Sequence, residues 1–254
     1  MDRLDAARLR LPGVDVRVLA RCPSTNSALL AADIAGPVLL ACEEQTAGRG
    51  QRGRRWHSLP GESITFSLAR LVRRPVRELA ALSLVAGVAC VRALRALGAA
   101  EVALKWPNDL LSAGAKLGGI LVETRAQGAS SLAVVGVGIN YHGNALLARR
   151  ARRRIASLES IPGFAASRNE TIREAARALL AALAAFEAAG LAAVRDEWEA
   201  LDAHAGQRLR VRLADGRVVS GVAAGLAADG ALRLRTRGGV RAVASGHVLS
   251  ARAA

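Results

Sequence analysis

The chain has 254 residues, of which 52% are hydrophobic and 22% are charged, and its formal net charge is +15 at pH 7. This apolar content excludes an intrinsically disordered chain, and the length suits one main domain with a small appendage. Three cysteines without metal-ligand spacing argue against a disulfide framework and a structural zinc site, so we expect a reducing, cytoplasmic location. The N-terminus carries no secretory signal. The longest apolar stretch, 79–91, is too short to span a membrane and predicts a buried helix.

The basic residues are spread along the whole chain, which weakens the case for a nucleic-acid-binding protein. Few aromatic residues are present to stack on bases, namely three Trp, one Tyr and three Phe. The positive charge would attract an acidic protein partner equally well. Of the 36 basic residues only Lys105 and Lys116 are lysine. Because ammonium and guanidinium groups are not interchangeable at a crowded oxyanion, we expect chemistry at these positions.

Apolar periodicity predicts strands and helices along most of the chain. Strands are predicted at 14–20, 38–42, 64–68, 102–105, 116–123 and 132–137. Helices are predicted after Pro23, with Ser24 or Thr25 as the N-cap, and at 76–97, 170–188 and 191–201. The arginine run 149–154 predicts a solvated or loop segment because like charges repel, and contact with phosphates or a partner is the alternative.

From Gln207 onward, short alternating segments separated by Asp-Gly and Gly-Gly turns predict a small β-barrel. The chain changes character near 202–206, so we expect a main domain over 1–204 and a C-terminal barrel over 205–254. The predicted fold class is α+β, with a mixed β-sheet packed with helices and the small barrel attached.

The segment 48–56 has no periodicity and combines four arginines with three glycines. Glycines let backbone amides approach an anion while the guanidiniums neutralise it, which favours a flexible phosphate-binding loop. The segment matches neither a Walker A loop nor a dinucleotide-binding fingerprint. An exposed arginine-rich loop without a ligand is the alternative.

Three further segments place polar side chains at the ends of predicted strands. The segment 105–109, Lys-Trp-Pro-Asn-Asp, is a strand followed by a proline-fixed turn that presents an amide and a carboxylate together, which suits a ligand or a metal. Lys116 begins a strand whose two glycines permit close approach of a ligand, and the segment 136–140 ends in a polar amide. As alternatives, Asp109 could cap a turn and Trp106 could fill the core.

Taken in order, five segments resemble the hallmark arrangement of the biotin protein ligase family. They are Ser24-Thr25-Asn26, Gly-Arg-Gly-Gln-Arg-Gly-Arg-Arg-Trp at 48–56, Lys-Trp-Pro-Asn-Asp at 105–109, Lys-Leu-Gly-Gly-Ile-Leu-Val-Glu at 116–123 and Gly-Val-Gly-Ile-Asn at 136–140. The resemblance extends from about Cys22 to the C-terminal barrel. It implies a catalytic domain like those of class II synthetases, with a C-terminal SH3-like barrel.

The resemblance also implies a reaction in two steps. Biotin and ATP form biotinyl-5′-AMP with release of pyrophosphate, and the biotinyl group is then transferred to a lysine of a biotin carboxyl carrier protein, a partner of acetyl-CoA carboxylase or a related carboxylase. Because two anions must meet, we expect positioning and charge neutralisation, completed by Mg²⁺, rather than proton chemistry. A lipoate-protein ligase with the same acyl-adenylate logic is the nearest alternative.

Site residues follow from the resemblance. The implied biotin site comprises Ser24, Thr25, Asn26, Gln45, Arg49, Gly50, Gln51 and Lys116. The implied ATP site comprises Arg52, Arg54, Lys105, Asn108, Asp109 and Asn140, with Asp109 as the candidate Mg²⁺ ligand. The expected catalytic residues are Lys116, Arg52 and Arg54. Ser24 and Asn26 could alternatively serve only as helix caps.

One position departs from the family pattern. Gln51 stands where many members carry arginine, so we expect looser retention of the adenylate unless the neighbouring Arg52 compensates. Only 23 residues precede Ser24, whereas repressor-type members add an N-terminal winged helix of roughly 60 residues. We therefore expect a monofunctional enzyme without specific DNA binding and without a membrane association, and a homodimer is one open alternative for its assembly.

Overall fold

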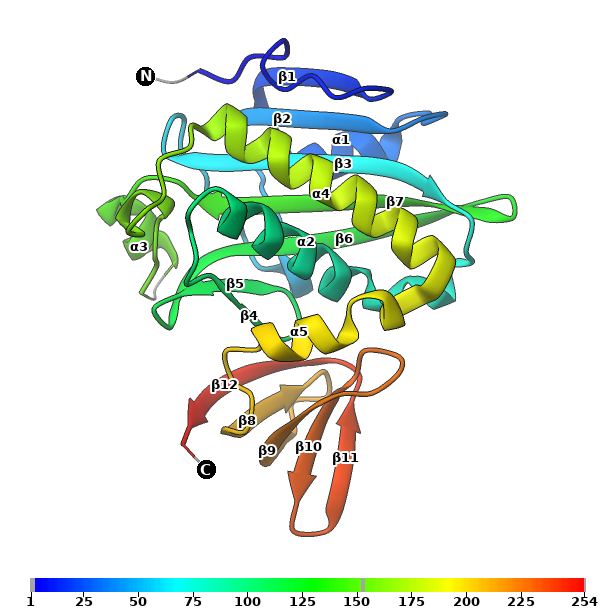
Figure 1. The fold of residues 1–254 in the computed structure, drawn as a ribbon, viewed down its shortest axis with the longest axis vertical. Coiled ribbons are helices and arrows are strands. Elements are labelled where there is room, and N and C mark those ends of the chain that lie inside the picture. The colour runs from blue at the N-terminus through cyan, green and yellow to red at the C-terminus, as the bar shows by residue number, and fades with distance from the viewer. Residues whose placement is uncertain (1–2, 152–153, 254) are drawn as a thin grey trace.

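The centre of the molecule is a seven-stranded β-sheet in the order β1-β2-β3-β7-β6-β5-β4 (Figure 1). The description is based on a computed structural model and covers residues 3–151 and 154–253. The strands are β1 (Asp15–Cys22), β2 (Val38–Gln45), β3 (Ser63–Val72), β4 (Ala103–Lys105), β5 (Asp109–Ser112), β6 (Ala115–Gln127) and β7 (Ser130–Asn140). β1 and β2 are parallel, and the other neighbouring strands pair antiparallel. The predicted mixed sheet is confirmed.

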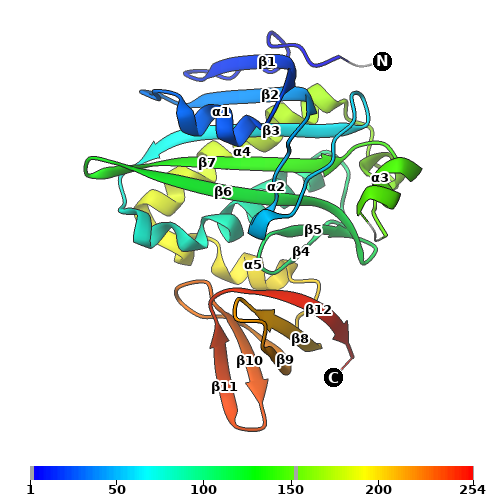
Figure 2. The same ribbon diagram turned by 180° about the vertical axis from the view of Figure 1, so that it is seen from behind.

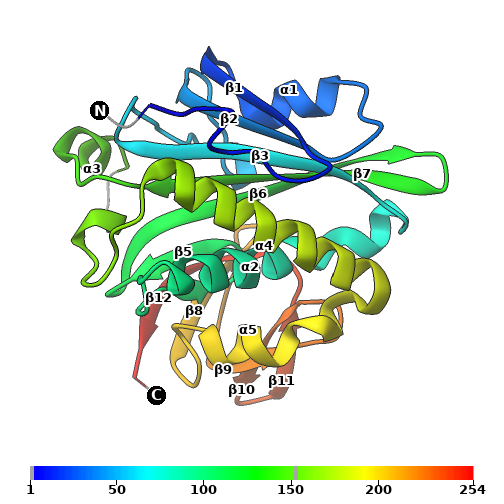
Figure 3. The same ribbon diagram turned by 45° about the horizontal axis from the view of Figure 1, so that its top comes forward.

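Helices cover both faces of this sheet. α2 and α4 lie side by side on one face, α1 lies on the opposite face, and α5 lies between the sheet and the C-terminal strands (Figures 1, 2 and 3). The helices are α1 (Thr25–Ala31), α2 (Leu82–Ala96), α3 (Ala145–Ala151), α4 (Arg168–Ala189) and α5 (Arg195–Leu201). Short 3₁₀ helices are η1 (Gln51–Gly53), η2 (Val76–Ala81), η3 (Leu158–Ser160) and η4 (Gly190–Ala193).

Alternation along β7 shows how the two layers are built. Its odd-numbered residues, such as Val135 and Ile139, join the large core under α2 and α4. Leu132 and Val134 point to the other face and pack with Leu29 of α1 in a smaller cluster. Side chains on successive strand residues face opposite sides of a sheet, so this strand can bury apolar residues on both faces.

Two helical segments, 76–96 and 168–193, are long and apolar enough by composition to cross a membrane. In the structure α2 and α4 pack against each other, and both supply residues of the main core. Eleven of the 15 residues of α2 are buried, including Val85, Ala89 and Leu94. The prediction of a buried helix in this part of the chain is therefore confirmed, with its first turns forming η2 rather than α-helix.

The C-terminal strands form a second, five-stranded antiparallel sheet in the order β11-β10-β9-β8-β12. They are β8 (Arg208–Leu213), β9 (Val218–Leu226), β10 (Leu232–Thr236), β11 (Gly239–Val243) and β12 (Gly246–Arg252). The predicted barrel is not closed, because β11 and β12 lie at opposite edges. Four of the five residues of β11 are exposed, Val240 among them, as is typical of an edge strand without a partner on its outer side.

The structure also corrects two local predictions. Arg149 and Arg150 belong to the short helix α3 rather than to a loop, but both are exposed, as is Arg154, so the prediction of a solvated segment is confirmed for these three residues. Arg152 and Arg153 lie outside the described residues. Asp109, predicted at the end of a turn, is the first residue of β5, which pairs with both β4 and β6.

A buried ion pair attaches the N-terminal segment to β2 and α4. Arg168 is 1% exposed, and its Nη1 lies 2.6 Å from Glu43 Oε2. The backbone N–H of Leu4 donates to the other carboxylate oxygen of Glu43 at 2.8 Å. Burial raises the pKa of Glu43, but hydrogen bonds from Arg168 and Leu4 outweigh burial and hold this pKa below its usual value.

We expect Arg168→Met to lower the free energy of unfolding by about 3–5 kcal/mol, because Glu43 would keep a largely buried charge without its partner. Unfolding in urea measures this loss. The matched control is Arg177→Met, whose side chain is 66% exposed, and it should cost less than about 1 kcal/mol. Equal stability of Arg168→Met and the unaltered chain would contradict the assignment.

Candidate active site

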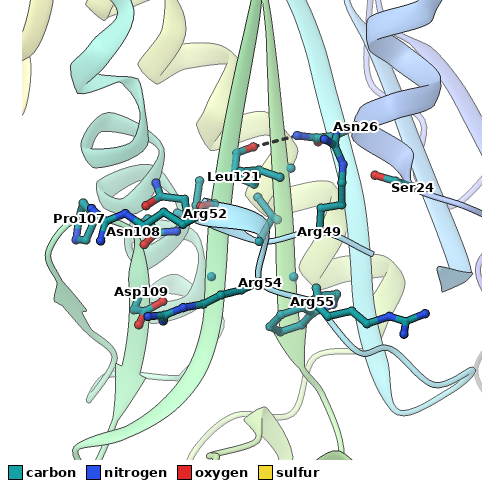
Figure 4. A pocket seen from close by; sticks show the side chains of 18 of the residues that line it. Ser24, Asn26, Arg49, Arg52, Arg54, Arg55, Pro107, Asn108, Asp109 and Leu121 are labelled. Carbon is teal, nitrogen blue, oxygen red and sulfur yellow. Dashed lines mark hydrogen bonds between the residues drawn. The ribbon is translucent and has the colours of Figure 1, made fainter. Parts of the chain in front are cut away.

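A cavity with about 860 Å³ of empty space, including its open mouth, lies between the sheet, the turn 106–108, β12 and the loop 48–56, here named the arginine loop. The predicted residues that line it are Ser24, Thr25, Asn26, Gln45, Arg49, Gly50, Gln51, Arg52, Arg54, Asn108, Asp109 and Lys116. Figure 4 shows several of these side chains converging from different elements.

Hydroxyl and amide groups at one end of the cavity form a connected network. The backbone N–H of Thr25 donates to Gln45 Oε1 at 2.8 Å. Ser67 Oγ, from β3, lies 2.6 Å from both Thr25 Oγ1 and Asn26 Oδ1. Within the described part of the chain, Gln45 Nε2 has no hydrogen-bond partner, so its N–H donors are available to a ligand.

Asn26 is held by β6 as well as by Ser67. Its Nδ2 donates to Leu121 O at 3.1 Å, drawn in Figure 4, and to Glu123 Oε2 at 2.9 Å. Arg49 Nη2 donates to the same Glu123 oxygen at 2.8 Å. Ser24 is the N-cap of α1, as predicted, and accepts from the Ser27 N–H at 3.4 Å. The hydroxyl proton of Ser24 remains available for donation.

Two glycines of β7 let other elements approach the sheet at this point. A Cβ on Gly136 would lie 2.3 Å from Asn26 Oδ1, and one on Gly138 would lie 2.5 Å from Cε2 of Trp56. Such distances are far below van der Waals contact, so any side chain here would displace α1 or the arginine loop. Trp56 Nε1 is itself buried without a hydrogen-bond partner in the described structure.

The arginine loop is folded rather than irregular. The backbone N–H of Trp56 donates to Gly48 O at 2.9 Å, which closes the base of the loop. Its tip is the short helix η1, where Arg52 adopts the left-handed conformation with φ +58°. Arg52 Nη2 donates to Ser245 Oγ at 3.0 Å. The loop tip therefore contacts the turn between β11 and β12 of the C-terminal sheet.

Lys116 and Asp109 form an ion pair on the floor of the cavity, with side chains 14% and 10% exposed. Two backbone contacts fix this position of β6. Asn140 Nδ2 donates to Lys116 O at 3.2 Å and to Ala156 O at 3.0 Å, and the Ala156 N–H donates to Lys116 O at 2.9 Å. The ammonium group is thus held on a rigid strand.

Two residues predicted for the ATP site lie outside the lining of this cavity. Lys105, on β4, pairs with Asp109 in the register of β4 and β5. Asn140 lines a neighbouring cavity that it shares with Lys116. Asn108 does line the main cavity, and its Nδ2 donates to Ile120 O at 2.7 Å.

The sequence analysis missed the contribution of β12, from which Gly246 and His247 reach the cavity. His247 alternates with the buried Gly246 and Val248, so strand periodicity alone would point it toward solvent. Burial lowers the pKa of His247 to about 4, and the positive charges of Arg54 and Lys105 add to this effect. The imidazole is therefore neutral at pH 7.

The described residues contain no group of three or more His, Cys, Asp or Glu side chains placed to share a metal ion. Asp109 is the one acidic side chain among the described residues that line the cavity. The arrangement fits a Mg²⁺ ion that arrives with substrate phosphates, because such an ion needs only one or two protein carboxylates.

Two family models match this chain. Residues 18–140 match the Biotin/lipoate A/B protein ligase family, and residues 204–249 match the Biotin protein ligase C terminal domain. The first match contains the arginine loop and both lysines, and the second contains the β12 residues that reach the cavity.

Curated relatives cover nearly the whole chain. The Biotin--[acetyl-CoA-carboxylase] ligase of Mycobacterium tuberculosis is 37% identical over 92% of this chain and 88% of its own. The ligase of the same name from Paracoccus denitrificans is 33% identical over 91% of this chain and 98% of its own. The Bifunctional ligase/repressor BirA of Escherichia coli is 35% identical over 94% of this chain and 75% of its own.

A solved structure agrees with these relatives. The biotin protein ligase from Aquifex aeolicus in complex with biotin and ATP superposes with a TM-score of 0.79 and 26% identity, covering 94% of this chain and 99% of that one. The similarity includes the sheet, its helices and the C-terminal strands, so fold and sequence lead to the same result: this chain belongs to the biotin protein ligase family.

Proposed function

We propose that this chain is a biotin–protein ligase, which forms biotinyl-5′-AMP from biotin and ATP and transfers the biotinyl group to a lysine of a biotin carboxyl carrier protein. The observation that carries the proposal is one cavity that combines an amide and hydroxyl network with Lys116 and the arginine loop. Relatives named Biotin--[acetyl-CoA-carboxylase] ligase support the reaction, and the Aquifex aeolicus complex supports both small substrates.

The hydroxyl and amide end of the cavity suits the ureido group of biotin, which both donates and accepts hydrogen bonds. We assign the biotin site to Ser24, Thr25, Asn26, Gln45, Arg49, Gly50, Gln51 and Lys116. Gln45 Nε2 and the Ser24 hydroxyl are the donors available for the ureido oxygen, and the Thr25 network orients them. Apolar lining residues such as Ile120 and Val137 offer surface to the ring and the acyl chain.

The cationic end suits the first step. We assign the ATP site to Arg52, Arg54, Lys105, Asn108, Asp109 and Asn140. A carboxylate oxygen of biotin attacks the α-phosphorus of ATP, the bond from this phosphorus to the oxygen bridging to the β-phosphate breaks, and pyrophosphate leaves with the electron pair. Both reactants are anions, so Lys116, Arg52 and Arg54 act by holding them together and stabilising the charge on the transferring phosphate.

The second step uses the same centre. The acceptor amine attacks the carbonyl carbon of biotinyl-5′-AMP, the bond from this carbon to the phosphate oxygen breaks, and AMP leaves while the amine loses a proton to solvent. Lys116 remains beside the anhydride oxygens and takes part in both steps. Asp109 would hold Mg²⁺ together with the phosphates of ATP, and Mg²⁺ would neutralise part of the phosphate charge.

We further assign residues 1–204 to the catalytic unit and 205–254 to the C-terminal unit, in line with the C-terminal family match from residue 204.

We expect the protein to act in the cytoplasm, where its carrier would be an acetyl-CoA carboxylase subunit or a related carboxylase. A homodimer stays one open alternative for the assembly, which sedimentation can check, and the absence of specific DNA binding stays a prediction, which a gel-shift measurement can check. Lipoate is the competing acid, but the named relatives and the C-terminal match favour biotin.

Biotin-dependent exchange between ATP and pyrophosphate tests the first step, with lipoate as the control acid. We expect Lys116→Gln to reduce this exchange by about 100- to 1,000-fold, because a charge that stabilises the transition state is removed. The matched control is Arg177→Gln, which removes an exposed charge of α4 outside the cavity and should leave the exchange within about twofold. Exchange at the unaltered rate in Lys116→Gln would contradict the role of Lys116.

Replacing Gln51, an uncharged residue of the arginine loop, with arginine should make the loop retain biotinyl-5′-AMP more firmly. We expect Gln51→Arg to slow the release of biotinyl-5′-AMP by about tenfold, because a guanidinium adds a charge-assisted hydrogen bond. Timed release from the purified complex measures this, and Gln127→Arg near the distal end of β6 is the matched control. Identical lifetimes in Gln51→Arg and the unaltered chain would contradict the expectation.

His247 makes the stability of the fold depend on pH. Its folded-state pKa of about 4 lies below its ordinary value of 6.5, so the unfolded chain binds the proton more strongly. The stabilising contribution of neutral His247 to the free energy of unfolding is fully present above pH 6.5 and is lost as the pH falls toward 4. We expect His247→Asn to lose less stability over this interval than the unaltered chain. An NMR titration midpoint of His247 near 6.5 would contradict this interpretation.

A further inference from the structure

Ser67 joins two residues of α1 that line the polar end of the active-site cavity. It lies on β3 with 0% of its surface exposed, between Leu40 of β2 and Gly136 of β7. Its Oγ is 2.6 Å from both Thr25 Oγ1 and Asn26 Oδ1. Ser67 belongs to none of the five hallmark segments and is not among the described residues that line the cavity. Any influence of Ser67 on a ligand is therefore exerted through Thr25 and Asn26.

The orientation of the Asn26 amide is determined by β6. Its Nδ2 donates to Leu121 O at 3.1 Å and to Glu123 Oε2 at 2.9 Å, and carbonyl and carboxylate oxygens are acceptors. If the amide were flipped, its oxygen would face these two oxygens without a proton between them. Asn26 Oδ1 therefore faces Ser67. Because a carbonyl oxygen carries no proton, the Ser67 hydroxyl is the donor in this hydrogen bond.

The direction of the Thr25 hydroxyl follows from that of Ser67. A serine hydroxyl has one proton, which Ser67 donates to Asn26. The contact of 2.6 Å between the Ser67 and Thr25 oxygens also needs a proton, so Thr25 donates and Ser67 accepts. Gln45 Oε1 lies farther from Thr25 Oγ1, at 3.2 Å, and accepts the backbone N–H of Thr25 at 2.8 Å. Thr25 Oγ1 thus offers a ligand a lone pair, whereas Gln45 Nε2 offers it N–H groups.

We propose that Ser67 is a positioning residue that makes Thr25 Oγ1 a hydrogen-bond acceptor toward the ligand and thereby selects an acid whose ring carries an N–H group next to its carbonyl. The inference rests on the proposed function, because the ureido group of biotin has this pattern. Gln45 Nε2 donates to the ureido oxygen, and Thr25 Oγ1 accepts from the adjacent ring N–H. A ring oxygen in place of that N–H would meet the Thr25 lone pair, and the site would reject such an analogue because no proton lies between the two oxygens.

The test compares the binding of biotin with that of closely related acids. These are the two cyclic carbamate analogues of biotin, in which a ring oxygen replaces one ureido N–H. Both isomers are needed, because only one of them places its oxygen at Thr25. The dissociation constant of each acid is measured by titration calorimetry with the full-length chain. Biotin-dependent ATP–pyrophosphate exchange and thermal unfolding are recorded for every variant.

Three variants separate a role in selection from a role in the fold. Ser67→Ala removes the hydroxyl, and Ser67→Thr keeps it. The matched control is Thr65→Val, because Thr65 lies on the same strand, is 1% exposed and donates to Cys42 O at 2.6 Å. This control removes a buried hydroxyl that bonds to the backbone instead of to Thr25 and Asn26. A general loss of stability should thus affect Ser67→Ala and Thr65→Val alike.

We expect the unaltered chain to bind biotin about 100-fold more tightly than the disfavoured carbamate. In Ser67→Ala the Thr25 hydroxyl can turn and donate to the ring oxygen, so this preference should fall by about tenfold. Ser67→Thr and Thr65→Val should retain the preference within about twofold.

An unchanged preference in Ser67→Ala, with both acids bound more weakly by the same factor, would overturn the inference, since Ser67 would then only support the fold. An equal fall of the preference in Thr65→Val would overturn it too. If the unaltered chain binds no biotin and shows no exchange, the proposed function fails, and this inference fails with it.

Discussion

The ion pair between Lys116 and Asp109 is the interaction on which the arrangement of the site depends. Both side chains are largely buried, so each charge needs the other as long as no ligand is present. An incoming carboxylate or phosphate can replace Asp109 as the partner of the ammonium group without leaving it unpaired. The pair therefore keeps the Lys116 ammonium group charged in the interior of the protein, where an anionic ligand can bind it, at a modest cost in stability.

The surrounding fold holds this charge in place through the backbone rather than through side-chain packing. β6 carries Lys116 between β5 and β7, and Asn140 ties its carbonyl oxygen to the chain that follows α3. Facing it, two glycines of β7 allow α1 and Trp56 to approach the sheet closely. A polar end and a cationic end then arise within one cavity, which suits a small acid whose carboxylate must reach a nucleotide.

Several strands, the start of α1 and most residues that line the cavity could be predicted from the sequence, because the patterns that indicate them are local. Alternation located β3, an apolar run located β7, the Ser24 cap located α1, and the arginine loop and Lys116 stood out by composition and spacing. Other features depend on contacts distant in the chain. β5 is a strand because β4 and β6 flank it, and His247 reaches the cavity because α5 sets the C-terminal sheet against the main one. The turns between the C-terminal strands were signalled locally, but whether the edge strands β11 and β12 meet depends on the twist of the whole sheet, which short-range patterns do not encode.

The contact between Arg52 and Ser245 joins residues 193 positions apart. Through it, the tip of the arginine loop, which lines the cavity, contacts a module that has its own strands and its own family model. The two modules are thus parts of one enclosure, and an exchange of C-terminal modules between relatives would alter how the loop closes even if every residue of the catalytic sheet were kept.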